Sequence, residues 1–181
     1  MGKLMTVPAR TRPDLLAAPV LAALTNFLDE ELAARVLVAP IDPGLADTAA
    51  FCAAYEVGPD VSANCVVVSG KREGEVRYAA CVVLATTRAD VNNVVRRYLD
   101  VRKASFAATD VAVAETGMEY GGITPIGLPK GWPVLIDARV AATPTVVIGS
   151  GVRHSKLALP GADLAVLPGA EVVDGLAKPV D

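Results

Sequence analysis

The segment Tyr120-Gly121-Gly122-Ile123-Thr124-Pro125-Ile126-Gly127 is the most informative stretch of this sequence. Two adjacent glycines allow positive backbone torsions and the close approach of another molecule. Thr124 favours an extended conformation because a proline follows it. Such a loop can direct successive backbone N–H groups at one point, as an oxygen that gains negative charge in a reaction requires. A purely structural turn would have the same composition, so the rest of the chain has to decide between the two.

The sequence on both sides of this glycine loop (residues 120–127) predicts a mixed α/β fold. Strands are expected at residues 33–38, 65–68, 76–86, 103–107, 134–137, 145–148, 156–159 and 171–173. Helices are expected at residues 16–28, 47–55, 90–99 and 110–117, with a helical turn within residues 160–167. The polar turn between the second and third strands predicts a hairpin, whereas other spacings suit crossovers. The sequence therefore predicts a mixed β-sheet flanked by helices.

The length of 181 residues suits one domain with a short extension. Residues 1–28 are expected to form a helical extension packed on a domain of residues 29–181. Apolar residues recur at helical intervals from Leu16 to Leu28, and the acidic run at residues 29–31 follows. Pro19 would be costly inside that helix, so a kink or a later start is expected.

Composition excludes several classes of protein. Hydrophobic residues make up 52% and charged residues 20%, which argues against disorder. No run approaches the roughly 18 apolar residues of a membrane span, and no signal peptide is evident, so we expect a cytoplasmic protein without a membrane partner. The three cysteines form no CxxC pair and His154 is the only histidine, so neither a metal nor another cofactor is expected.

The net charge of −3 limits contact with nucleic acid to a local basic surface. The best candidate combines Arg88, Arg96, Arg97, Arg102 and Lys103. Arg153, His154 and Lys156 form a smaller candidate. Both groups could equally be ordinary solvated charge.

Several segments, in order, resemble the YbaK-like family of aminoacyl-tRNA deacylases and prolyl-tRNA synthetase editing domains. Gly121 and Pro125 match the glycine and proline of the family's GxxxP loop. Residues 63–68 resemble its early core strand, residues 90–106 the helix and strand before the loop, and residues 148–153 its late glycine-rich turn. The resemblance covers roughly residues 36–173.

The resemblance implies that the protein hydrolyses the ester of amino acids wrongly attached to tRNA, without a metal. The implied partners are the acceptor end of mischarged tRNA, most of all tRNAPro carrying alanine or cysteine, and a synthetase. The implied catalytic residues are Asn64, Gly121, Gly122 and Ser150. The implied substrate-binding residues are Asp47, Thr48, Ile123, Thr124, Pro125, Gly151, Arg153 and His154.

Two departures from the family pattern leave alternatives open. Asn64 stands where the family has a lysine, and His154 and Lys156 stand where it often has a glycine and an acidic residue. A neutral amide in place of the lysine would suit a catalytically weak module that binds tRNA or a synthetase. An unrelated small-molecule hydrolase is a further alternative, and it would require His154 as its base.

Overall fold

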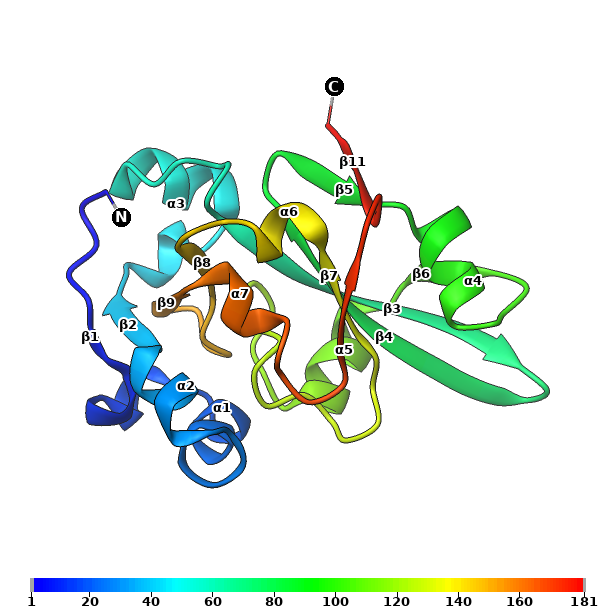
Figure 1. Ribbon diagram of the computed structural model, residues 1–181, viewed down its shortest axis with the longest axis horizontal. Coiled ribbons are helices and arrows are strands. Elements are labelled where there is room, and N and C mark those ends of the chain that lie inside the picture. Colours follow the sequence, from blue (N-terminus) through cyan, green and yellow to red (C-terminus); the bar gives the residue numbers. More distant parts are fainter. Residues whose placement is uncertain (1, 181) are drawn as a thin grey trace.

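The computed structural model describes residues 2–180, and its larger sheet is mixed, as predicted. Five strands follow one another in the order β10 (Ala170–Val173), β7 (Val134–Asp137), β4 (Glu75–Leu84), β3 (Ala63–Arg72) and β6 (Ala104–Phe106). The first three are mutually parallel, whereas β3 pairs antiparallel with both β4 and β6. The predicted hairpin is formed by β3 and β4, and its turn lies at the same end of the molecule as α4 (Figure 1).

A second sheet lies against the beginning of this hairpin. Its order is β1 (Val7–Pro8), β2 (Leu37–Pro40), β9 (Ser155–Leu159) and β8 (Val146–Gly149), and all its pairs are antiparallel. A single bridge between Ser62 and Val147 joins the two sheets, so β8 lies beside the start of β3. Two further strands, β5 (Thr87–Ala89) and β11 (Ala177–Pro179), pair with each other.

Short helices surround the sheets (Figure 1). The α-helices are α1 (Ala18–Ala22), α2 (Glu30–Arg35), α3 (Thr48–Tyr55), α4 (Arg96–Tyr98), α5 (Thr109–Thr116), α6 (Ala138–Ala141) and α7 (Gly161–Leu164). The π-helical turns η3 (Ala23–Phe27) and η5 (Val91–Val95) continue α1 and precede α4. The 3-10 turns are η1 (Ala9–Thr11), η2 (Pro13–Leu15) and η4 (Pro43–Leu45). None of the helices in residues 2–180 has the length and apolar character needed to cross a membrane.

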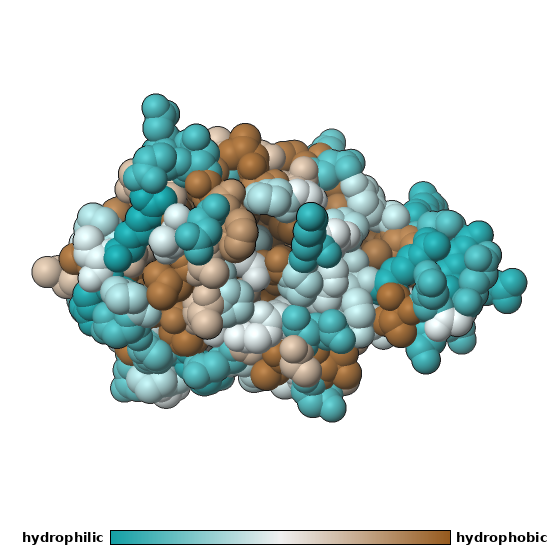
Figure 2. Space-filling model, turned by 90° about the horizontal axis from the view of Figure 1, so that it is seen from below, coloured by the Kyte–Doolittle hydropathy of each residue, from teal (hydrophilic) through white to brown (hydrophobic). Residues whose placement is uncertain are grey.

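One hydrophobic core joins both sheets and the N-terminal segment. It includes Leu24 from η3, Val38 from β2, Ile136 from β7 and Leu157 from β9, all almost fully buried. Hydrophilic side chains instead cover the projecting end of the molecule (Figure 2), where the β3–β4 turn carries a run of charged residues. The core therefore sits where the two sheets meet.

One sequence-based prediction in the N-terminal third needs correction. The strand predicted at residues 33–38 begins later, at Leu37, because the preceding residues form α2. Asp29 caps this helix, since its carboxylate accepts hydrogen bonds from the N–H groups of Glu31 and Leu32. The first helix has the later start that Pro19 suggested, and the proline lies in the first turn, where its missing N–H costs little.

Candidate functional site

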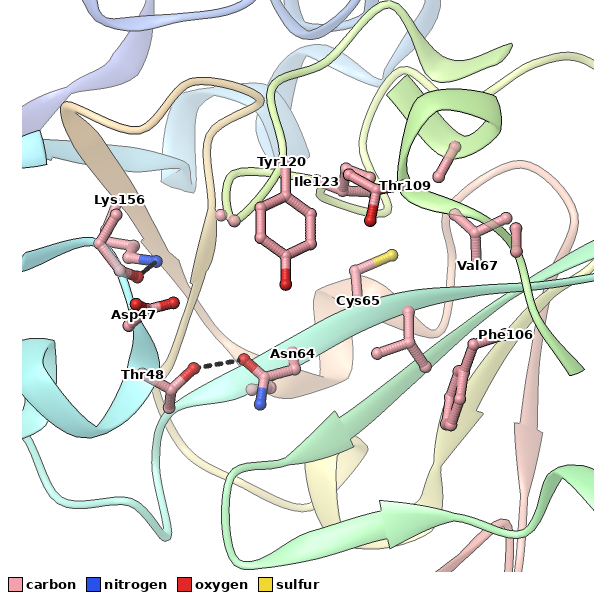
Figure 3. A pocket seen from close by; sticks show the side chains of 17 residues that line it. Asp47, Thr48, Asn64, Cys65, Val67, Phe106, Thr109, Tyr120, Ile123 and Lys156 are labelled. Carbon is pink, nitrogen blue, oxygen red and sulfur yellow. Dashed lines mark hydrogen bonds between the residues drawn. The ribbon is translucent and has the colours of Figure 1, made fainter. Parts of the chain in front are cut away.

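A pocket of about 460 Å³ opens between the start of β3 and the glycine loop. Figure 3 shows Tyr120 and Ile123 on one side and Asn64 with Thr48 on the other, with Lys156 at one end and Phe106 at the opposite end. The remaining lining residues are mostly small: Ala46, Asp47, Ala63, Cys65, Val66, Val67, Ala107, Thr109, Ala112, Gly121 and Gly149. The sheet, α3, α5 and the glycine loop thus each supply one wall.

Backbone packing holds the glycine loop against the late glycine turn (residues 148–153). The Gly122 carbonyl accepts a hydrogen bond of 2.7 Å from the N–H of Gly151. A Cβ atom on Gly122 would lie 2.6 Å from the carbonyl oxygen of Val152, and one on Gly149 would overlap the Gly122 carbonyl. Glycine is required in both segments because their main chains touch.

The backbone donors of the loop are only partly available to a ligand. Gly122, predicted to be catalytic, donates its N–H to the carbonyl of Glu119 at 2.9 Å, so this donor is already engaged within the chain. Within residues 2–180, no protein acceptor pairs with the N–H groups of Gly121 or Ile123. Gly121 is exposed and has φ +81°, a conformation that favours glycine. Two donors, rather than three, therefore remain at this wall of the pocket.

Asn64 and the start of α3 form the opposite wall. The hydroxyl of Thr48 donates a hydrogen bond of 2.7 Å to Oδ1 of Asn64, which fixes the amide in the pocket (Figure 3). Asp47 precedes α3, but its carboxylate makes no capping hydrogen bond to the helix. This carboxylate therefore remains available at the pocket wall. The structure brings these three predicted residues together.

Lys156 is the site residue that the sequence-based assignment missed. Its ammonium group donates to the Ala46 carbonyl at 3.2 Å and lies 5.3 Å from the centre of the Phe51 ring. Burial lowers the pKa of Lys156, and Arg153 lowers it further, whereas Cys52 and Asp47 oppose the shift. Among the described lining residues, Asp47 and Lys156 alone carry charge.

A signal for Lys156 was present in the sequence, because its charge is opposite to the acidic residue that the resembling family often has there. Lys156 is thus a cation on β9, whereas Asn64 is neutral in the early strand at residues 63–68. The structure shows that both positions line one pocket.

Ser150 does not line the pocket, contrary to the predicted catalytic role. It is fully buried, and its hydroxyl lies 2.6 Å from that of Ser155 and within hydrogen-bonding distance of two carbonyl groups. The Ser155 hydroxyl in turn donates to the carbonyl of Leu15. Ser150 therefore fastens the late glycine turn to the N-terminal segment.

Thr124, Pro125 and Gly151, predicted to bind substrate, also lie outside the lining. All three are buried, and a Cβ atom on Gly151 would overlap the side chain of Ala17. The Thr124 hydroxyl has no hydrogen-bond partner in the described part of the chain. Because all three are buried and none lines the pocket, their contribution is to the packing that supports the loop.

Arg153 and His154 occupy different places at the edge of the site. Arg153 donates to the carbonyls of Tyr120 and Pro43, both at 3.1 Å, so it ties the glycine loop to η4. His154 instead contacts the Asp14 carbonyl through Nε2 at 3.1 Å and does not line the pocket. The structure therefore does not bring His154, predicted to bind substrate or to act as the base of a small-molecule hydrolase, to the lining of the pocket.

Two of the three cysteines, Cys65 and Cys81, are held in the thiol form by burial. Burial raises the pKa of the Cys65 thiol far above its usual range, with a smaller contribution from Cys81. Burial also raises the pKa of Cys81 to about 12. In residues 2–180, no cluster of three His, Cys, Asp or Glu side chains is arranged to hold a metal ion. The chemistry of the pocket therefore rests on backbone donors, amides, hydroxyls and one pair of opposite charges.

Comparisons with known proteins agree with this architecture. Residues 42–167 match the model of the aminoacyl-tRNA editing domain family, and the chain belongs to that family. The YbaK-like fold predicted from the sequence is confirmed by a solved structure of a candidate trans-editing enzyme for prolyl-tRNA synthetase. This structure has a TM-score of 0.71 and 20% identity over 87% of this chain and 94% of that chain.

Two other solved structures show the same fold. A scaffold protein carrying a computationally grafted epitope has a TM-score of 0.71 and 21% identity, over 87% of this chain and 95% of that one. A hypothetical protein has a TM-score of 0.71 and 19% identity, over 82% and 95% of the two chains. At these identities the likeness concerns the fold alone.

Proposed function

We propose that this protein is a trans-acting aminoacyl-tRNA deacylase that hydrolyses the ester of mischarged tRNA, with tRNAPro carrying a small wrong amino acid as its substrate. The observation that carries the proposal is the pocket itself, where free backbone donors of the glycine loop lie across from Asn64 and Lys156. Small side chains at Ala63 and Ala112 suit an alanyl or cysteinyl group. Membership of the editing-domain family supports the same activity.

The reaction needs little more than positioning and electrostatic stabilisation. Water adds to the ester carbonyl carbon, and the carbonyl oxygen gains negative charge in the tetrahedral intermediate. The N–H groups of Gly121 and Ile123 would donate to this oxygen. The bond between the carbonyl carbon and the ribose oxygen then breaks, and that oxygen leaves with a proton. The products are the free amino acid and tRNA with an intact ribose hydroxyl.

The two charges at one end of the pocket have complementary roles in this proposal. The Asp47 carboxylate would bind the α-ammonium group of the amino acid. The Lys156 ammonium would stabilise the charge that develops on the carbonyl oxygen. Asn64, whose amide is fixed by Thr48, would hydrogen-bond the ribose. Holding the reactive ester in this arrangement accounts for catalysis without a nucleophilic side chain.

One observation favours a second candidate, a module that binds tRNA or a synthetase with little turnover. Asn64 is neutral where the resembling family has a lysine, and its amide oxygen is already engaged by Thr48. This candidate requires that Lys156 not replace the missing charge.

Hydrolysis of a panel of mischarged tRNAs decides between them. The panel includes tRNAPro carrying alanine, cysteine or serine, with Asn64→Lys tested beside the wild type. The proposal predicts selective turnover by the wild type. Turnover by Asn64→Lys alone would instead support the binding module, and silence from both would refute the deacylase.

A further inference from the structure

Phe106 is an exposed aromatic side chain between two depressions of the surface. It ends the edge strand β6, and 42% of its area is exposed. It lines the main pocket at the end opposite Lys156 (Figure 3). It also lines a neighbouring depression of about 430 Å³. Phe106 therefore borders both depressions.

The guanidinium group of Arg88 lies over this ring, 5.8 Å from its centre. Arg88 is exposed, and no carboxylate of residues 2–180 pairs with it. The other polar residues of the depression are Asn92, Asp90 and Lys178, of which the last two form a salt bridge of 2.7 Å. An aromatic face beside a free guanidinium is the usual combination for binding an unpaired nucleobase together with its phosphate.

Free positive charge is concentrated on this side of the molecule. Five cations between residues 88 and 103 have no ion-pair partner in residues 2–180, namely Arg88, Arg96, Arg97, Arg102 and Lys103. In contrast, Arg10, Arg12 and Arg35 at the N-terminal side are each paired with a carboxylate. Although the whole chain has a net charge of −3, residues 88–103 supply local positive charge that complements a phosphate backbone.

We propose that Phe106 and Arg88 form a shelf that binds the unpaired 3′ nucleotides of tRNA, one base on the face of the Phe106 ring that Arg88 does not cover and an adjacent phosphate at Arg88. This inference rests on the proposed function, because it places the aminoacyl ester in the pocket and the strand leading to it on the shelf. The depression beside Asn92 then holds the nucleotide before the stacked base. The shelf reads no base edge, so it tolerates different bases.

Binding of deacylated tRNA tests the shelf without requiring turnover. Phe106→Leu keeps an apolar side chain but removes the stacking face, whereas Phe106→Trp keeps the face. Phe27→Leu is the matched control, since Phe27 is 73% exposed and lines neither depression. We expect Phe106→Leu to weaken binding roughly 5- to 150-fold, the range measured for stacking of one base. Phe106→Trp and Phe27→Leu should bind like the wild type.

A second probe is the same tRNA with its unpaired 3′ nucleotides removed. The wild type should bind it more weakly, and Phe106→Leu should cause no further loss. Arg88→Gln should lower the slope of log affinity against log salt by about 0.7, the value for one single-strand phosphate contact.

The outcomes separate the shelf from the proposed function. Any of three results would overturn the shelf alone. Phe106→Leu binds as tightly as the wild type, Phe106→Trp loses as much affinity as Phe106→Leu, or the wild type binds tRNA without its 3′ nucleotides as tightly as intact tRNA. No binding of either tRNA by the wild type would overturn the shelf and the proposed function together.

Discussion

Replacing Lys156 by methionine removes the one cation among the described lining residues of the pocket, together with its cation–π contact with Phe51, and keeps an unbranched side chain of similar length. A unit charge about 4 Å from another contributes ~4 kcal/mol at the effective dielectric constant of a protein surface. The carbonyl oxygen of the ester is only partly charged in the transition state, and the pocket is open to water, so about half of this interaction energy remains. A loss of about 2 kcal/mol lowers kcat/KM roughly 30-fold.

The assay is single-turnover hydrolysis of alanyl-tRNAPro, corrected for spontaneous hydrolysis. Lys156→Arg keeps the charge and should retain most activity. Lys130→Met provides the matched control, because Lys130 is exposed and lies outside the pocket. Equal rates for Lys156→Met and the wild type, or equal losses in Lys156→Met and Lys156→Arg, would refute the electrostatic role.

The same variants predict a pH dependence. Burial lowers the pKa of Lys156 below the usual 10.5. Activity that needs the ammonium is present below this pKa and is lost as the pH rises through it. The wild-type rate should therefore fall on the alkaline side below pH 10.5, and Lys156→Arg should abolish the fall. An unchanged alkaline limb in Lys156→Arg would assign the titration to another group.

Three further predictions concern the scaffold. Gly122→Ala should lower stability by about 3 kcal/mol in urea unfolding, because its Cβ would meet main-chain atoms, whereas Gly44→Ala meets only a side chain and should change little. Ser155→Ala should cost about 1–3 kcal/mol by breaking a buried hydrogen bond to the N-terminal segment, and an unchanged Tm would contradict this. Burial raises the pKa of Asp137, but hydrogen bonds from Arg139 outweigh it, so the net pKa is lowered. Asp137→Asn should therefore lose about 3 kcal/mol of unfolding free energy at pH 7. The advantage of the wild type should vanish as the pH falls through the lowered pKa of Asp137, which urea titrations at pH 7 and at acidic pH would show.

Much of the fold could be predicted from local patterns in the sequence. The β3–β4 hairpin has two apolar runs around a charged turn, and α5 ends where Gly117 adopts the left-handed conformation. The short strands β5 and β11 were missed because strands of three residues whose partners lie about 90 positions away carry no local signal. The strand at residues 33–38 was placed too early because apolar residues there suit either element.

The candidate site was only partly predictable for a related reason. Asn64 at the start of β3, Asp47 and Thr48 at the start of α3, and Gly121 and Ile123 of the glycine loop line one pocket. The resemblance implied a catalytic Ser150, yet its hydroxyl contacts the buried hydroxyl of Ser155, a partner that no local pattern reveals. Lys156 reaches the pocket through pairing of β9 with β8, which no local pattern reveals.

The central claim is that the aminoacyl end of tRNA occupies this pocket, and amide NMR spectroscopy tests it without catalysis. The probe is adenosine with alanine joined to its ribose by a stable amide. We predict saturable chemical-shift changes at Asn64, Gly121, Ile123 and Lys156, which weaken in Lys156→Met. Changes confined to surfaces away from these residues, or no changes at millimolar probe, would contradict the account.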